Sequence, residues 1–159
     1  MCGISGSGKT HYAQELEKTG YIRLSSDALI WEKAGPGLSN LPDYKQKQLF
    51  MESRREILCH LASLLKSGKR VVVDATNCKY SSRNEIRRIC SEVDVKPQFI
   101  YCQADKEVLW QRLSQRKGSG PDDLIVSSEQ LADYWEGFER PHGDENDFIF
   151  LYTGSHKSI

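Results

Sequence analysis

The feature that most constrains this chain is a glycine-rich octapeptide at its start. Residues 3–10 read Gly-Ile-Ser-Gly-Ser-Gly-Lys-Thr and fit the pattern G-x-x-x-x-G-K-[ST] of a phosphate-binding loop. Glycines let the backbone curl so that several N–H groups face one anion. An accidental turn is the alternative, but a periodic helix pattern follows at once. The loop therefore predicts a nucleotide site whose binding residues are Gly3, Ser5, Gly6, Ser7, Gly8, Lys9 and Thr10.

Two side chains of the loop carry specific chemistry. Lys9 brings a positive charge to the terminal phosphates, and the hydroxyl of Thr10 is placed to bind Mg²⁺. The helix that follows directs the positive end of its dipole at the same anion. The expected ligands are therefore ATP and Mg²⁺.

Helix-like and strand-like stretches alternate after this loop. Periodicity predicts helices over residues 9–18, 44–67, 82–93, 105–117 and 128 onward, the third and fifth behind the capping boxes Ser82-x-x-Glu85 and Ser127-x-x-Gln130. Apolar or alternating runs predict strands over residues 21–25, 70–74, 97–102 and 147–152. This alternation predicts an α/β fold with a mainly parallel sheet. We expect one domain over residues 1–159, with a frayed tail from Thr153.

The strand that normally leads into such a loop is not evident. Only Met1 and Cys2 precede Gly3, whereas a parallel strand buried on both faces needs a run of about five apolar residues. We therefore expect the first, central strand to be nearly missing and the chain to be short at its N-terminus. An alternative start codon, an incomplete gene model or trimming of the chain would each produce this.

Composition limits the partners of the chain. Lys plus Arg and Asp plus Glu each number 22, so the formal net charge is zero and gives no whole-chain basic field for nucleic acid. The five cysteines are odd in number and widely spaced, which argues against a disulfide framework or a zinc site. No apolar run is long enough for a signal peptide or a membrane span. We therefore expect a cytoplasmic protein without a membrane partner, and no obligate protein partner is evident.

Two carboxylates are expected near the loop. In open α/β sheets the ligand lies at the carboxyl ends of the strands, where Asp27 and Asp74 follow two predicted strands. After three valines, Asp74 has the context of a carboxylate that acts on Mg²⁺, directly or through Thr10 and water. Asp27 is then the candidate base for an acceptor hydroxyl. The alternatives are a helix N-cap for Asp27 and a turn residue for Asp74.

Two arginines stand beside a flexible stretch. Arg112 and Arg116 are four residues apart and would share one face of the predicted helix, and Gly118-Ser-Gly-Pro121 follows them. This pattern is typical of a lid, here at about residues 112–127, that closes over ATP and neutralises charge on the transferred phosphoryl group. Exposed arginines on a helix are also often no more than a solvated face.

Together these motifs resemble one group of P-loop kinases. The similarity is to the polynucleotide-kinase-like and zeta-toxin-like AAA-type kinases, which include 5′-hydroxyl polynucleotide kinases. It runs from the loop to about Tyr152 and rests on Ser-Ser-Asp27, Val-Val-Val-Asp74-Ala-Thr-Asn77, Arg112-Leu-Ser-Gln-Arg116 and Phe138-Glu139-Arg-Pro141. The resemblance implies an ATP-dependent kinase in which Lys9 and Thr10 bind ATP and Mg²⁺, Asp27 activates the acceptor, Asp74 supports Thr10 and the metal, and Arg112 and Arg116 are lid arginines.

Two other positions bear on the resemblance. Arg83 matches a recurring arginine of the group, without an assigned role, and is otherwise expected to be a surface residue of a helix near Ser82. Ile30 stands where the phage enzyme has an arginine that contacts the acceptor's phosphate. Ile30 and the neutral charge favour a small-molecule acceptor, whereas the closeness of the motifs favours a polynucleotide 5′ end, so both stay open.

Three functions therefore remain open. The first is transfer of the γ-phosphoryl group of ATP to a hydroxyl acceptor. The second is an ATP-binding or ATP-hydrolysing switch without an acceptor, which would not need Asp27; a GTPase would want N-K-x-D, and the chain has only Asn77-Cys-Lys79-Tyr. The third is an inactive, truncated remnant.

Overall fold

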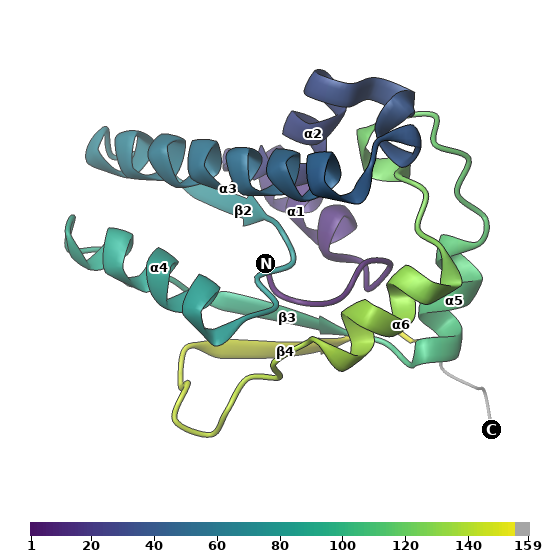
Figure 1. Ribbon diagram of the computed structural model, residues 1–159. Coiled ribbons are helices and arrows are strands. Elements are labelled where there is room, and N and C mark those ends of the chain that lie inside the picture. The colour runs from purple at the N-terminus through teal and green to yellow at the C-terminus, as the bar shows by residue number, and fades with distance from the viewer. Residues whose placement is uncertain (155–159) are drawn as a thin grey trace.

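The computed structural model describes residues 1–154 of the chain (Figure 1). Within this range the α-helices are α1 (Lys9–Lys18), α2 (Ser26–Ala34), α3 (Asp43–Lys66), α4 (Tyr80–Ser91), α5 (Lys106–Leu113) and α6 (Ser128–Glu136). The strands are β1 (Ile22–Ser25), β2 (Val71–Asp74), β3 (Phe99–Gln103) and β4 (Phe148–Tyr152), and two short 3₁₀ helices are η1 (Gly35–Asn40) and η2 (Pro121–Asp123). No helix in this range combines the length and apolar character needed to span a bilayer.

The strands form two parallel pairs joined by the start of the chain. β1 pairs with β2, and β3 pairs with β4. Between them lie Met1 and Cys2: the Met1 amino group donates to the carbonyl of Val73 at 2.8 Å, and Cys2 forms a parallel bridge with Tyr101. The α/β fold with a parallel sheet is confirmed, and two residues fill the position between β2 and β3, which agrees with the expectation of a nearly missing central strand.

Alternate residues of the strands face two layers of helices. Val72, Ile100 and Cys102 pack against Ala13 of α1 on one face. On the other face Phe99, partly buried Val71 and Val73, and the apolar sides of α3 and α4 form a second core. Valine and other β-branched residues suit buried parallel strands. The short run 71–73 therefore packs against the helices on both faces of the sheet. Figure 1 shows α3 and α4 along one side of the strands and α5 and α6 at their carboxyl ends.

Most elements lie where the sequence predicts them. α1 has the predicted bounds, and Ser127 and Gln130 form the predicted capping box of α6. The predicted box at Ser82 is wrong, because α4 begins at Tyr80. The backbone carbonyl of Ser82 instead accepts a hydrogen bond from Arg54, which also pairs with Glu85 at 2.7 Å.

Two differences concern the neighbourhood of the loop. Residues 26–34 form the unpredicted helix α2, which Ser25 caps by accepting a hydrogen bond from the backbone N–H of Ala28 at 3.2 Å. The cap is therefore Ser25 and not Asp27. α5 ends at Leu113, so Arg116 lies beyond the helix and the predicted shared helix face is wrong.

Thr153, the first residue after β4, is held by hydrogen bonds. The N–H of Thr153 donates to the carbonyl of Gln103 at 2.7 Å, and its hydroxyl donates to the carbonyl of Ser7 at 2.8 Å. The prediction of a frayed tail is therefore wrong at Thr153, and residues 155–159 of that tail lie outside the described residues.

Candidate active site

The glycine-rich loop has the backbone conformation that its sequence predicts. Gly3, Gly6 and Gly8 have φ values of 138°, 84° and 90°, a region that side chains strongly disfavour. A Cβ on Gly3 would lie 2.5 Å from the carbonyl oxygen of Cys102 and 2.7 Å from Oγ of Ser7. Gly3 is therefore required both by its conformation and by the close approach of β3.

Lys9 is held inside the curl of the loop. Its side chain is buried, and Nζ donates to the carbonyl of Ile4 at 2.9 Å. Burial lowers the pKa of the Lys9 ammonium, and the negative charges of Asp74 and Asp27 oppose that shift. The ammonium therefore lies between the loop backbone and the two carboxylates, in surroundings where a charge interacts more strongly than in water.

Thr10 and Asp74 bring their side-chain oxygen atoms together beside Lys9. The Thr10 hydroxyl donates to Oδ1 of Asp74 at 3.4 Å, and Asp74 is 4% exposed. Oδ2 of Asp74 is buried and makes no hydrogen bond to any described residue, while Nε of Arg23 lies 3.5 Å from it. Burial raises the pKa of Asp74, and Lys9 and Arg23 counteract it. A hydroxyl and an orphaned carboxylate oxygen fit Mg²⁺, which prefers oxygen ligands.

Asp27 lies in the first turn of α2, opposite the loop. Its pKa is raised by burial and by the nearby charge of Asp74, while Lys9 acts in the opposite direction. The Ser26 hydroxyl donates to Oδ1 of Asp27 at 3.4 Å. A carboxylate with a raised pKa that lies beside the lysine of the glycine-rich loop has the properties expected of a general base.

The two arginines predicted for a lid make different contacts. Arg112, on α5, donates from Nη1 to the carbonyl of Gly6 at 3.0 Å and to the hydroxyl of Thr153 at 3.2 Å. Arg116 donates to the carbonyl of Leu124 at 3.1 Å, within the segment between α5 and α6. Although they do not share a helix, both guanidinium groups line the cavity beside the loop.

One cavity of about 220 Å³ gathers the side chains selected from the sequence. Its wall includes Ser5, Gly6, Gly8, Lys9, Thr10, Asp27, Asp74, Arg112 and Arg116. Gly3 and Ser7 support the loop from behind and do not line the cavity; Ser7 is 1% exposed and its Oγ has no partner among the described residues. The chain thus assembles one basic and acidic site from elements far apart in sequence.

A second, larger cavity adjoins the first. It measures about 680 Å³ and shares Ser5, Ser26, Asp27 and Thr76 with the smaller one. Its walls come from α2, η1 and the start of α3 on one side, and from residues 124–127 and α6 on the other. Asp27 is therefore in contact with both spaces.

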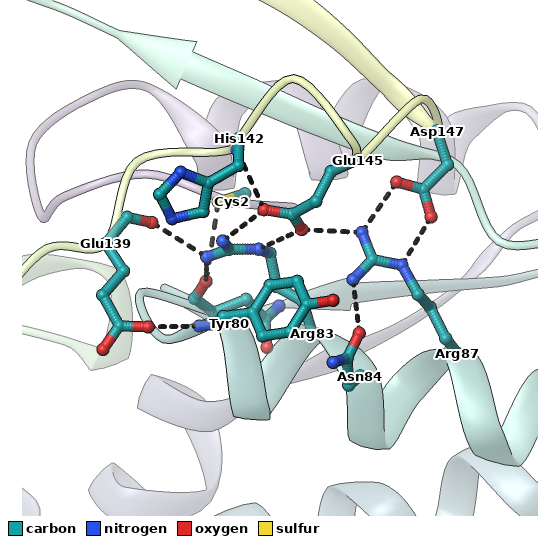
Figure 2. Close-up of polar contacts among 10 residues, drawn as sticks. Cys2, Tyr80, Arg83, Asn84, Arg87, Glu139, His142, Glu145 and Asp147 are labelled. Atoms are coloured by element: carbon teal, nitrogen blue, oxygen red, sulfur yellow. Dashed lines mark hydrogen bonds and ion pairs between the residues drawn. The ribbon is translucent and has the colours of Figure 1, made fainter.

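Arg83 anchors the segment that holds the loop (Figure 2). Its side chain is fully buried and pairs with Glu145 at 2.6 Å, so its prediction as a surface residue is wrong. The same guanidinium donates to the carbonyls of Asn77 and Glu139 at 3.2 and 3.0 Å. Arg87 adds a 2.7 Å pair to Glu145. These bonds tie α4 to the chain between α6 and β4.

Asn77 connects this network to the loop. The Asn77 amide donates to the carbonyl of Met1 at 2.7 Å, and the N–H of Gly3 donates to the carbonyl of Thr76 at 3.0 Å. Asn77 has a φ of 44°, a left-handed conformation that asparagine tolerates better than most residues. The loop entry is thus held by the segment after β2, in addition to the short bridge of Cys2.

Sequence reasoning missed the contacts of Arg23 and Asp122. Nη2 of Arg23 pairs with Oδ1 of Asp122 at 2.9 Å, and Nε2 of Gln14 donates to Oδ2 of Asp122 at 3.0 Å. These bonds join η2 to β1 and α1. The available signal was an arginine in a short strand that ends near two carboxylates predicted for the site, but only the fold shows that Arg23 lies between Asp74 and Asp122.

Comparison with known proteins agrees with this arrangement. The model of a family described as an AAA domain matches residues 1–141. The UPF0200 protein PAE1629 of Pyrobaculum aerophilum is 32% identical over 144 residues, covering 86% of this chain and 75% of that protein.

Solved structures show the same architecture. A gluconokinase from Sinorhizobium meliloti is 25% identical with a TM-score of 0.65, covering 95% of this chain and 79% of its own. The APS kinase CysC of Mycobacterium tuberculosis, solved with AMPPNP and APS, is 21% identical with a TM-score of 0.58, covering 96% and 85%. The fold is therefore that of P-loop kinases.

Proposed function

The chain belongs to this AAA domain family, and we propose that it is an ATP-dependent kinase that transfers the γ-phosphoryl group of ATP to a hydroxyl. The observation that carries the proposal is the position of Asp27, which lines the cavity at the phosphate-binding loop and also the larger cavity beside it. A switch that only hydrolyses ATP has no need of a carboxylate between a phosphate site and a second, larger binding space.

The reaction follows from the residues around the first cavity. The loop N–H groups and Lys9 bind the terminal phosphates. The Asp27 carboxylate takes the proton of the acceptor hydroxyl, whose oxygen forms a bond to the γ-phosphorus. The bond from that phosphorus to the bridging oxygen breaks, and ADP leaves with the electron pair. Arg112 and Arg116 stabilise negative charge that develops on the equatorial oxygens.

Thr10 and Asp74 would hold the metal of this reaction. Their oxygen atoms and the unpaired Oδ2 of Asp74 suit Mg²⁺, which neutralises phosphate charge when bound. We further propose that residues 112–127 act as the lid of a single kinase domain. The motif order supports a polynucleotide-kinase-like or zeta-toxin-like subtype of this family.

The test is phosphoryl transfer by an Asp27→Asn variant. With labelled ATP and a panel of small hydroxyl compounds and 5′-hydroxyl oligonucleotides, the parent protein transfers label to an acceptor. The variant loses about a hundredfold in kcat, the contribution of a positioned base, and keeps its thermal stabilisation by Mg-ATP.

A carboxylate on the exposed face of α1 provides the matched control. Glu17→Gln removes one negative charge without touching either cavity, so its rate should equal that of the parent. A full transfer rate in Asp27→Asn would defeat the proposed base. ATP cleavage at the same rate with and without every acceptor would favour the switch.

A further inference from the structure

The larger cavity is the one binding space of the site for which the loop motif predicts no occupant. It is built from two walls that lie apart in Figure 1, with α2 and η1 on one side and α6 on the other. Its volume of about 680 Å³ falls within the range of about 300–1,000 Å³ seen for small-molecule sites. Since Asp27 stands where the two cavities meet, a hydroxyl of the occupant can reach the proposed base.

Four aromatic side chains contribute to the walls. Trp31 on α2 and Phe50 on α3 line one side, and Tyr134 and Phe138 line the other. Phe50 and Tyr134 are 42% and 39% exposed, although both are large and apolar. Aromatic residues on opposite walls suit a flat ring, because aromatic rings stack on one another.

The charges on the walls disfavour an anion. The acidic side chains that line the cavity are Asp27, Asp43 and Asp133, and the basic one is Lys79, which pairs with Glu139 at 3.2 Å. No arginine appears among these lining residues, whereas Arg112 and Arg116 line the phosphate cavity. Burial raises the pKa of the Tyr134 hydroxyl most, and the negative charges of Asp27 and Asp133 raise it further. This agrees with a negative potential in the cavity.

Neutral polar groups complete the wall. Nε2 of Gln46 donates to the carbonyl of Leu41 at 2.8 Å, which leaves its amide oxygen as an acceptor. Oε1 of Gln130 accepts from the N–H of Ser127 at 3.0 Å, which leaves its amide nitrogen as a donor. Amide groups on opposite walls recognise an uncharged ring that carries both donors and acceptors.

We propose that the acceptor is an uncharged aromatic compound with a hydroxyl group, of the nucleoside class. This inference rests on the proposed kinase function and adds the class of its substrate. The base-like ring lies between Trp31 and Tyr134, and the hydroxyl lies at Asp27. The phosphate-bearing end of an oligonucleotide and a sugar acid both carry charge that the carboxylates of this cavity repel.

The test compares acceptors that differ in charge and in the presence of an aromatic ring. Transfer from labelled ATP is measured to the common nucleosides, to their 3′-monophosphates, to gluconate and to a 5′-hydroxyl oligonucleotide. A nucleoside should accept the phosphoryl group, and its 3′-monophosphate should have a kcat/KM lower by about tenfold or more, because its charge faces Asp43 and Asp133. Replacement of one carboxylate by a cation, Asp133→Lys, should narrow that difference.

Two variants on α3 test whether the nucleoside binds in the larger cavity. Phe50→Ala should raise the KM for the nucleoside by about tenfold and leave stabilisation by Mg-ATP unchanged. Met51→Ala is the control, since the neighbouring residue on α3 is 59% exposed and does not line the cavity.

The outcomes separate this inference from the proposed function. Faster transfer to gluconate, to the oligonucleotide or to the 3′-monophosphates than to any nucleoside would overturn the substrate class and leave the kinase standing. Failure of every nucleoside to accept, with another compound accepting, would do the same. No transfer to any compound, with ATP still hydrolysed, would remove the kinase and this inference with it.

Discussion

At the scale of single residues, Gly3 is the position with the least freedom. It combines a φ of 138° with a Cβ position 2.5 Å from the backbone of Cys102, and β3 cannot give way without disturbing the sheet. We expect Gly3→Ala to lower the free energy of unfolding by at least about 2 kcal/mol and to abolish thermal stabilisation by Mg-ATP. Chemical denaturation with and without nucleotide measures both effects.

Gly37→Ala is the control for Gly3→Ala. Gly37 lies in η1, has no left-handed φ, and a Cβ there would meet no atom within 4 Å. Gly37→Ala should therefore change stability little. Equal losses in the two variants would show that the close approach at Gly3 does not matter.

The carboxylate of Asp27 should be required for activity while it lowers the stability of the fold. Burial raises its folded-state pKa above the ordinary 3.8, so its charged form costs the folded protein free energy that grows as pH rises through the folded pKa. The acidic limb of kcat/KM should consequently lie above pH 3.8. Asp27→Asn should raise Tm by about 2 °C or more at neutral pH while it removes activity. A lower Tm would contradict the cost assigned to the buried charge.

At the scale of elements, η2 is joined to β1 by the pair of Asp122 and Arg23, 2.9 Å apart. Asp122→Asn should loosen this segment, because the pair with Arg23 loses one of its two charges. Trypsin cleavage after Lys117 should become several times faster, and added salt should produce the same change in the parent protein. Glu15→Gln, which removes a surface pair with Lys18, is the control and should leave the cleavage rate unchanged. Equal acceleration of cleavage in both variants would show that the Asp122–Arg23 pair does not hold η2 in place.

The network around Arg83 should set the acid limit of the fold. Burial alone would raise the pKa of Glu145, but hydrogen bonds from Arg83 and Arg87 lower it to about 2, from 4.5. The resulting stability is present above pH 4.5 and is lost as pH falls toward 2. The free energy of unfolding of the parent should therefore fall as the pH is lowered through this window. The Glu145→Gln variant should be less stable than the parent at neutral pH, and its stability should no longer depend on pH through this group. If the variant and the parent show the same dependence of unfolding free energy on pH, the role assigned to Glu145 is wrong.

At the scale of the whole molecule, the sequence predicted what depends on local pattern. The bounds of α1, the four strands and the capping box at Ser127 follow from periodicity and local hydrogen bonds. The buried state of Arg83 did not, because its partner Glu145 is 62 residues away and an arginine without a known partner is expected at the surface. The cavities likewise depend on α2, which carries a mixed pattern and is stabilised by its cap and its contacts with α3.

The site itself was predictable only in part for the same reason. Lys9, Thr10, Asp27 and Asp74 follow a loop motif and strand ends, which place them at one edge of the sheet. Arg23 and Thr153 carry no such signal, and their contacts exist only because distant strands align. The roles of all these residues stay predictions until the variants are measured.

The bonds of Thr153 also bear on how the protein is made. Its hydroxyl closes on Ser7, 146 residues earlier, and accepts from Arg112. A chain still being translated can therefore carry the whole glycine-rich loop and yet lack one of the contacts that hold it. Ribosome-bound chains cut short before residue 153 should not be protected by nucleotide against protease. The ability to hold ATP would then arise late in synthesis, and a nascent chain could not sequester nucleotide before its last strand is in place.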